Sequence, residues 1–430
     1  MISHLWNQWF LTERPSISLC VFRMAVAITT GFHVIPTFFH MDDNFYHTAF
    51  KELNGYFFTN KALELVQKSP DGLVTIMAVI FCMSFVSFFI GFRSQISCIV
   101  LMICCYFFYA LNAFFIGTLS WDILLVTLFL MCVVPYHGDY FSVDCLLKAN
   151  DHAYKTPRPF FLQRLLQLQI ASTFFYTALY KVTVDGNWIK DNPVYYLMSG
   201  PATGVAKHFL FKEWMVASPN FCYFIGLFVV AMELFLPFLL FYSKTRRSAI
   251  YLGVFFHLLL ILTLDVPAIF FFLFPAQLLL FINPEKIVKW IDQRREYHQV
   301  RPRPKLLYDG QCGFCLGSVQ ALKVMDLVSR VEFIDFRTLP DLSHIHPRLN
   351  AAVAASQIHL VESPEGERIY CGFYAFRRMS LLMPMLYPIA LILYFPGVGI
   401  WGPVMYSGIA RNRYFLHRNK ICNNNACFLR

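Results

Sequence analysis

The fold of the C-terminal part of this chain is decided by the stretch Tyr308-Asp309-Gly310-Gln311-Cys312-Gly313-Phe314-Cys315. Its Cys-x-x-Cys pair follows a short apolar run, 305–308, and precedes a helical pattern at 316–325. A strand that turns through such a pair into a helix places the first thiol at the helix N-terminus. Because unpaired N–H groups and the helix dipole favour a thiolate there, the stretch predicts thiol–disulfide chemistry.

The two thiols are expected to have different roles. Cys312 is nearer the helix start and is predicted to be the more exposed, so we expect it to attack the disulfide of a partner. Cys315, one turn inside the helix, is expected to resolve the mixed disulfide. Two interpretations stand for Asp309: it moves a proton to or from the inner thiol, or it is a turn residue before Gly310.

Two alternatives to redox chemistry remain open for this pair. One is half of a zinc site, with Cys422 and Cys427 as the other half. That second pair reads Cys-Asn-Asn-Asn-Ala-Cys, whereas zinc sites prefer a second CxxC or HxxxH. The other alternative is plain core packing. We favour redox chemistry and predict no metal site.

The composition of the chain is that of an integral membrane protein. Of its 430 residues, 57% are hydrophobic and 14% are charged, and the mean hydropathy is +0.51, whereas soluble proteins are about 25% charged. The formal net charge of +10 does not indicate nucleic-acid binding, because basic residues gather in short loops and after the last apolar run. The lipid bilayer is therefore the first predicted partner.

The sequence predicts about eight helices that cross a bilayer of ~30 Å. The apolar runs lie at 16–39, 72–92, 95–117, 119–136, 161–181, 220–242, 248–264 and 267–283. Lys and Arg without nearby acidic residues are more frequent in the loops assigned to the inside, which favours both termini in the cytoplasm. We therefore expect a multi-pass protein of an inner or plasma membrane.

The expected fold class is a polytopic α-helical membrane bundle at 1–284, then a linker at 285–304 and a small α/β domain at 305–430. In that domain we expect strands at 306–308, 331–336, 357–362 and 368–370, a hairpin turn at 363–367, and helices at 316–326, 374–382 and 403–412. The apolar run 385–400 is interrupted by proline and glycine. It is therefore expected to be a buried surface helix that ends in a turn, and not a ninth span.

Three motifs of the C-terminal domain resemble the DCC family of thioredoxin-like, predicted thiol–disulfide oxidoreductases. Within about 303–418 they are Asp-Gly-x-Cys-x-x-Cys from Asp309, Cys371-Gly372-Phe373-Tyr374-Ala375-Phe376, and Ala410-Arg411-Asn412-Arg413-Tyr414. The resemblance implies that Asp309, Cys312 and Cys315 are the signature residues and that 411–413 belongs to a closing helix. General thioredoxins have a cis-proline before the third strand, where this chain has Ala355-Ser356, so partner binding is expected to differ.

Several ionisable side chains fall within or at the edge of the predicted spans, where they are costly and call for a reason. We expect Arg23 to pair with Glu233 or Asp122. Lys181 ends an apolar helix: either its ammonium group reaches the membrane interface, or burial makes its neutral amine available as a base. His257 is expected to be a hydrogen-bonded packing residue rather than a catalytic one.

An ordered set of motifs over about 1–290 resembles the HTTM family, which includes vitamin K-dependent gamma-carboxylase. The resemblance implies that Lys181 is a base acting on a quinone-type cofactor and that Arg23, Glu233, His257 and Trp188 belong to the cofactor site. The chain has Trp121-Asp122 where the carboxylase has a catalytic histidine, and it lacks the large lumenal domain. Glutamate carboxylation is therefore not expected. The motifs are Phe22-Arg23-Met24, Phe141-Ser142-Val143-Asp144, Leu165-Leu166-Gln167-Leu168-Gln169, Ala178-Leu179-Tyr180-Lys181 with Trp188, Glu233-Leu234-Phe235-Leu236-Pro237, and His257.

The leading hypothesis is a membrane-anchored oxidoreductase that exchanges electrons with a protein thiol or disulfide partner. Its bundle would bind an apolar cofactor such as a quinone, or would serve only as an anchor. In a second hypothesis the bundle is an enzyme that uses Lys181 as base on a quinone or lipid, and the dithiol domain regulates it. In a third, the chain is a non-enzymatic membrane assembly factor.

Overall fold

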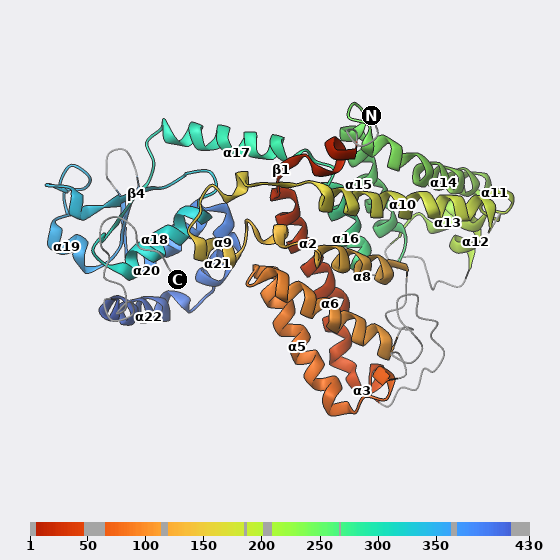
Figure 1. The fold of residues 1–430 in the computed structure, drawn as a ribbon, viewed down its shortest axis with the longest axis horizontal. Coiled ribbons are helices and arrows are strands. Elements are labelled where there is room, and N and C mark those ends of the chain that lie inside the picture. The colour runs from red at the N-terminus through yellow and green to blue at the C-terminus, as the bar shows by residue number, and fades with distance from the viewer. Residues whose placement is uncertain are drawn as a thin grey trace. The chain divides into compact units, whose positions relative to one another are not determined.

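The structure is a computed structural model that describes residues 6–46, 65–112, 119–184, 187–200, 209–265, 268–362 and 368–413. The chain forms two compact units. Unit 1 consists of 1–142 and 156–284, and unit 2 consists of 143–155 and 285–430. The helices and strands of both are drawn in Figure 1.

Unit 1 contains a main helix at each of the eight places that the sequence predicts. Five of these helices are long and apolar enough to span a membrane, which makes the chain an integral multi-pass membrane protein. Two are short, with 13 residues in α8 and 12 in α16. The eight are α2 (Ile17–Val34), α5 (Asp71–Ile90), α6 (Ser94–Leu111), α8 (Leu119–Met131), α10 (Phe161–Thr183), α14 (Pro219–Phe241), α15 (Arg246–Thr263) and α16 (Ala268–Leu279).

Shorter elements connect the main helices of unit 1. A two-stranded antiparallel ribbon pairs β1 (Glu13–Pro15) with β2 (Pro157–Pro159), so that it joins the starts of α2 and α10. The others are η1 (Asn7–Leu11), η2 (Ile35–His40), α3 (Met41–Asn44), η3 (Pro135–Gly138), α11 (Asn187–Lys190), α12 (Pro193–Ser199) and α13 (Lys212–Val216).

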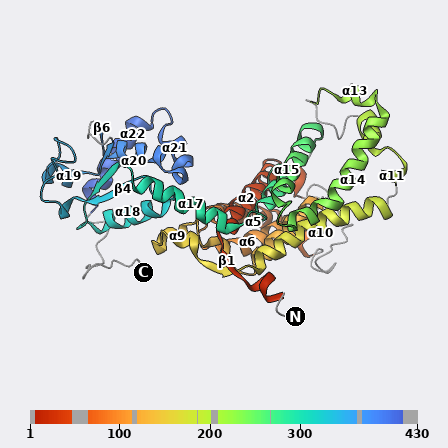
Figure 2. The same ribbon diagram turned by 90° about the horizontal axis from the view of Figure 1, so that it is seen from above.

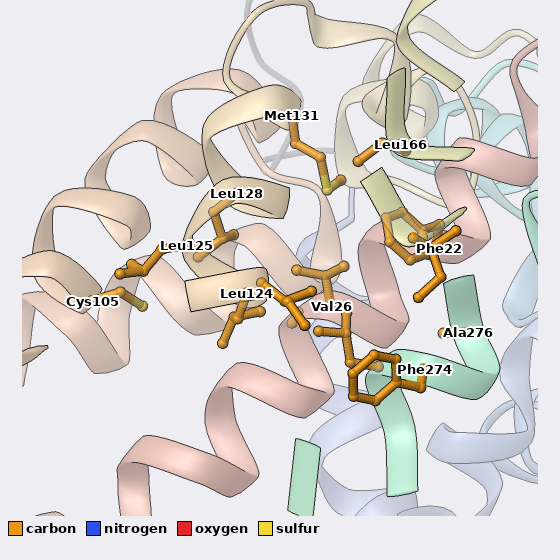
Figure 3. Close-up of a cluster of buried hydrophobic side chains, with 14 of the residues drawn as sticks. Phe22, Val26, Cys105, Leu124, Leu125, Leu128, Met131, Leu166, Phe274 and Ala276 are labelled. Carbon is orange, nitrogen blue, oxygen red and sulfur yellow. The ribbon is translucent and has the colours of Figure 1, made fainter. Parts of the chain in front are cut away.

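The core of unit 1 lies where α2, α8, α10 and α16 meet. Figure 3 shows Phe22 of α2, Leu124 of α8 and Phe274 of α16 pointing into one apolar cluster. By contrast, α5 exposes a row of large apolar side chains that includes Ile76 and Met83. A helix that is apolar on both its buried and its exposed side is what a lipid environment requires.

Unit 2 is a mixed α/β domain around a four-stranded sheet of order β4-β3-β5-β6. β3 (Lys305–Tyr308) is parallel to β4 (Glu332–Asp335) and antiparallel to β5 (His359–Glu362), which pairs antiparallel with β6 (Arg368–Cys371). Alternate residues of β3 face opposite cores: Leu306 joins residues of α18 (Gly313–Met325) and α20 (Phe373–Leu382), and Leu307 packs beside η5 (Phe336–Thr338) and α19 (Ala351–Ser356).

The segment expected to be a linker contains a helix, α17 (Pro284–Gln299), whose apolar residues recur at helical spacing and whose Ile291 is buried. One prediction about unit 2 was wrong. The run 385–400 forms η6 (Pro384–Leu386) and α21 (Tyr387–Leu393), but α21 is not buried: Leu391 and Ile392 are exposed. The remaining elements are α22 (Val398–Asn412), α9 (Val143–Lys148) and η4 (Ala153–Lys155). The predicted turn at 363–367 lies outside the described residues.

Candidate functional site

Cys312 and Cys315 lie at the junction of β3 and α18, as the sequence predicts. Cys312 is the N-cap residue of α18, and its Sγ accepts the backbone N–H of Cys315 at 3.3 Å. Neither thiol is in a disulfide. An acceptor at this position takes the place of a capping oxygen, and it gains stability when it is charged. The sulfur of Cys312 therefore occupies the capping position at the start of α18.

The prediction that Cys312 is the more exposed thiol was wrong. Cys312 has 0% of its surface exposed, whereas Cys315 is partly exposed. The pKa of Cys315 is raised to about 12, mainly by burial and then by the hydrogen bond with Cys312 and the charge of its sulfur. The two cysteines therefore differ. Cys312 is buried and caps the helix, whereas Cys315 retains its proton.

Asp309, just after β3, is held in place by two hydrogen-bond partners. Its carboxylate forms a two-pronged ion pair with Arg337, with Nε–Oδ1 and Nη2–Oδ2 distances of 2.9 and 3.0 Å. It also accepts the N–H of Gln311 at 3.0 Å, which is the turn contact expected of it. Its side chain is only 2% exposed. A buried carboxylate paired in this way is held ionised, and its negative charge acts on Cys315.

Gly310 is required by the close approach of β4. Asp335 accepts the N–H of Gly310 at 3.0 Å and also the N–H of Arg337. A Cβ atom at position 310 would lie 1.9 Å from Oδ2 of Asp335. The glycine of the Asp-Gly pair is therefore explained by packing: without a side chain at position 310, the carboxylate of Asp335 can bind the loop that leads to the thiols.

A small pocket opens beside Cys315. Its volume is about 50 Å³, and residues of β3, α18, α20 and α22 line it. Two of the lining residues, Tyr406 and Arg413, lie on or at the end of α22. The guanidinium of Arg413 donates to the carbonyl of Ala355, and its charge lowers the pKa of Cys315, although burial outweighs it. The closing helix implied by the DCC resemblance thus forms one wall of the dithiol site.

The backbone before β5 is already hydrogen-bonded at this pocket. The N–H of Ile358 donates to Oη of Tyr406 at 3.1 Å, and its carbonyl accepts the N–H of Gly372 at 2.9 Å. Gly372 has φ +56°, and a Cβ atom there would lie 2.6 Å from the side-chain oxygen of Gln357. The segment Ala355-Ser356 ends α19, and residues 357–358 lead into β5. An incoming peptide cannot pair with Ile358 unless Tyr406 moves.

Arg337, Tyr406 and Arg413 were not predicted as site residues. Arg413 lies in a motif that the sequence did single out, but only as part of a helix. Arg337 and Tyr406 lie 28 and 97 residues after Asp309 in the printed numbering, and no local pattern connects them to it.

In unit 1 the structure brings together three of the predicted residues. Nζ of Lys181 lies 2.6 Å from both carboxylate oxygens of Glu233, which links α10 to α14. The ring of Trp188 covers the ammonium group, with its centroid 4.6 Å from Nζ. The side chains of Lys181 and Glu233 are 18% and 11% exposed. This is a desolvated ion pair with an aromatic cover.

Arg23 and His257 are placed elsewhere. The expected pairing of Arg23 with Glu233 or Asp122 was wrong: Arg23 is fully buried and donates to the backbone carbonyls of Phe89, His137 and Phe141. The sequence does not show this because carbonyls at the ends of other segments provide the site.

His257 stacks on Phe274, with ring centroids 5.2 Å apart, and also contacts Phe174. Neither of its ring nitrogens has a hydrogen-bond partner among the described residues. The expectation that it is hydrogen-bonded was therefore wrong. It is buried in an aromatic environment on α15, between α10 and α16.

Within the described part of the chain, no three His, Cys, Asp or Glu side chains are close enough together to bind a metal ion. Cys422 and Cys427, the other half of the zinc alternative, lie outside the described residues.

Comparison with protein families matches both units. The HTTM domain model matches residues 12–286, and the DCC1-like thiol-disulfide oxidoreductase model matches residues 306–419. No curated protein and no solved structure matches the chain. The HTTM match includes 143–155, the segment that packs within unit 2.

Proposed function

This chain belongs to the HTTM family and continues into a DCC1-like thiol-disulfide oxidoreductase domain, and on this basis we propose that it is a membrane-anchored oxidoreductase whose redox centre is Cys312 and Cys315. One observation supports this proposal above the others: Sγ of Cys312 caps α18 and accepts the N–H of Cys315 at 3.3 Å. This arrangement stabilises one thiolate beside one protonated thiol, which is the starting state for disulfide exchange.

The proposed reaction transfers two electrons to a partner disulfide. The thiolate of Cys312 attacks one sulfur of the partner. A Cys312–partner S–S bond forms, the partner's S–S bond breaks, and the leaving thiolate takes up a proton. Cys315 then loses its proton to solvent and attacks the sulfur of Cys312. The intramolecular disulfide forms and the second partner thiol leaves, so the dithiol is oxidised and the partner is reduced.

Access to Cys312 requires a local movement, since the side chain is buried. The pocket beside Cys315 is the opening through which a partner sulfur reaches the pair. Phe314, which lies between the two cysteines, and Tyr406 line this pocket.

The experiment is to read the redox state of both cysteines in cells by thiol mass-tagging after acid quench, and to repeat it with Cys315→Ser. We expect the variant to accumulate a mixed disulfide through Cys312, because the resolving thiol is gone. The matched control adds Cys371→Ser to Cys315→Ser: Cys371 is a free, partly buried thiol of the same unit, and its removal should leave the trapped adduct unchanged. Two fully reduced thiols without an adduct would contradict the proposal.

A second candidate function concerns the Lys181 group in unit 1. An ammonium group has three N–H donors, and Glu233 lies within hydrogen-bond distance through two oxygens, which leaves one donor for a quinone oxygen. An apolar quinone would supply a two-electron, two-proton acceptor for the dithiol. Transfer of a proton from Lys181 to Glu233 would give a neutral amine that acts as a base beside Trp188. In an alternative, the same Lys181 amine would act as a base on a lipid and not on a quinone.

The test of this candidate is Lys181→Met. We expect quinone-dependent oxidation of the Cys312–Cys315 dithiol to be lost, while reduction of a small soluble disulfide is retained, because the two reactions share only the dithiol. Lys190→Met, a change at another lysine of unit 1, is the control. If the quinone-dependent oxidation kinetics are unchanged in Lys181→Met, this candidate function is contradicted, and the bundle serves only as an anchor.

A further inference from the structure

The hairpin of α21 and α22 exposes an apolar face on unit 2. Seven of its large side chains are each at least 62% exposed. They come from the end of α21, the connection and the first half of α22. They are Leu391, Ile392, Phe395, Ile400, Trp401, Val404 and Met405. A patch of this kind on a soluble domain marks an interaction surface.

The two sides of α22 differ in what they contact. Gly402, Tyr406, Ala410 and Arg413 recur at helical spacing, and the last three line the dithiol pocket. Gly402 is buried against α20. Trp401 and the apolar residues at 404 and 405 lie on the other side and are exposed. Figures 1 and 2 both show α22 beside α20, with α21 near its start. The apolar face is therefore the outer surface of the helix whose inner surface closes the redox site.

The sequence that carries this face has an excess of basic residues. After Glu367 the sequence contains no Asp or Glu up to residue 430, whereas its basic residues are Arg368, Arg377, Arg378, Arg411, Arg413, Arg418, Lys420 and Arg430. An apolar face on a segment with an excess of basic residues, with Tyr394 at its border under the guanidinium of Arg377, fits a bilayer surface that contains anionic headgroups. A second copy of the chain fits poorly, since pairing two such segments would bring like charges together.

We propose that the α21–α22 hairpin is an interfacial membrane anchor, which inserts its apolar face into the headgroup region of the bilayer that holds unit 1. The helix pair α20 and α21 is bent by 114° at its break, so it does not form a straight crossing. The occupant of the apolar face is lipid. Because the chain is a multi-pass membrane protein, a bilayer is always within reach of unit 2.

The consequence for the redox site rests on the proposed function. If α22 lies on the bilayer, the pocket that its inner side closes is held at the membrane surface. The substrates within reach of Cys315 are then thiols and disulfides near the ends of membrane helices, or apolar redox molecules in the lipid. Soluble protein disulfides would be reduced more slowly.

The experiment uses the full chain in nanodiscs of phosphatidylcholine and phosphatidylglycerol. Photo-crosslinking residues are introduced as Leu391→p-benzoylphenylalanine and, separately, Trp401→p-benzoylphenylalanine. Asp341→p-benzoylphenylalanine, at an exposed position of the same unit, is the control. We expect lipid adducts by mass spectrometry at 391 and 401 and none at 341.

Adducts to a second copy, adducts to residues 1–284 of the same chain, or an absence of adducts would each overturn the proposal. Reduction of a small soluble disulfide by the same samples reports the dithiol chemistry separately. Failure of the anchor is thereby distinguished from failure of the redox function.

Discussion

At the scale of single residues, two charged groups near Cys315 shift its pKa in opposite directions. The carboxylate of Asp309 raises the pKa of Cys315, and the guanidinium of Arg413 lowers it, although burial has the largest effect. The two groups approach from different parts of unit 2, the end of β3 and the end of α22. Substitutions at these positions are therefore expected to change the reactivity of the same thiol in opposite directions.

Asp309→Asn removes the negative charge that disfavours the thiolate, so it lowers the pKa of Cys315. Arg413→Gln removes a favourable positive charge and raises that pKa. Below the pKa the rate of alkylation follows the thiolate fraction. At a fixed pH between 8 and 9, well below the pKa of about 12, Cys315 therefore reacts faster in Asp309→Asn and slower in Arg413→Gln than in the unmodified chain. Site-resolved mass spectrometry with iodoacetamide measures both rates.

Asp341→Asn is the control for these two variants, since Asp341 is an exposed acid outside the pocket. Its rate should equal that of the unmodified chain. Changes of the same sign in Asp309→Asn and Arg413→Gln would show that the variants act through loosened packing and not through charge.

At the scale of elements, residues 143–155, which lie between α8 and α10 in the chain, belong to unit 2. α9 packs against α18, the helix that Cys312 caps. Tyr154 is 1% exposed, and its hydroxyl donates to Asp292 of α17 at 2.7 Å. Arg295 of α17 donates to the carbonyl of Asp151 and lies over the ring of Tyr154. A loop between two helices of the bundle thus supports the redox helix.

We expect Tyr154→Ala to destabilise unit 2 by about 3–5 kcal/mol, because it removes a fully buried aromatic ring. Tyr154→Phe retains the ring and loses one hydrogen bond, which costs about 1 kcal/mol. Lys155→Met removes the other partner of Asp292, an ion pair at 2.8 Å with both side chains more than 40% exposed, and it should cost less than about 1 kcal/mol.

Hydrogen exchange of the α18 amides in the full chain measures these costs, since local opening of the supported helix reports its stability. The order of protection should be unmodified chain, Lys155→Met, Tyr154→Phe, Tyr154→Ala. Equal protection of α18 in Tyr154→Ala and the unmodified chain would mean that the segment does not stabilise the redox helix.

At the scale of the whole molecule, the number of crossings decides which compartment the dithiol faces. Five helices meet the length and composition of a span, whereas α8, α10 and α16 lie where three more are predicted. An even number of crossings places both ends of the bundle on one side, and an odd number places them on opposite sides. This matters because a reducing cytosol keeps dithiols reduced, whereas an oxidising compartment favours the disulfide.

We expect eight crossings with both termini in the cytoplasm, because the basic loops favour that orientation. Fusions of green fluorescent protein and of alkaline phosphatase to the C-terminus of the full chain provide the measurement. Fluorescence without phosphatase activity is the expected result. Phosphatase activity without fluorescence would place unit 2 outside and would make oxidation of partners the preferred direction.

The sequence by itself determined the features that depend on neighbours along the chain. The apolar runs predicted where the main helices of unit 1 lie, because a span needs continuous apolar length. The strand, the CxxC turn and the helix at 305–325 followed from a short apolar run, the position of the first cysteine at the helix start and helical spacing. The Asp-Gly pair before the dithiol and the hairpin strands β5 and β6 also depend on neighbours along the chain.

Only the tertiary structure decided which distant groups meet. It gave Lys181 the carboxylate of Glu233, gave Arg23 three backbone carbonyls, and buried Cys312 instead of exposing it. It also assigned 143–155 to unit 2 and left the face of α21 exposed. The physical reason is the same in each case: burial and partner choice depend on segments far apart in the chain, and local pattern specifies an element without specifying what packs against it.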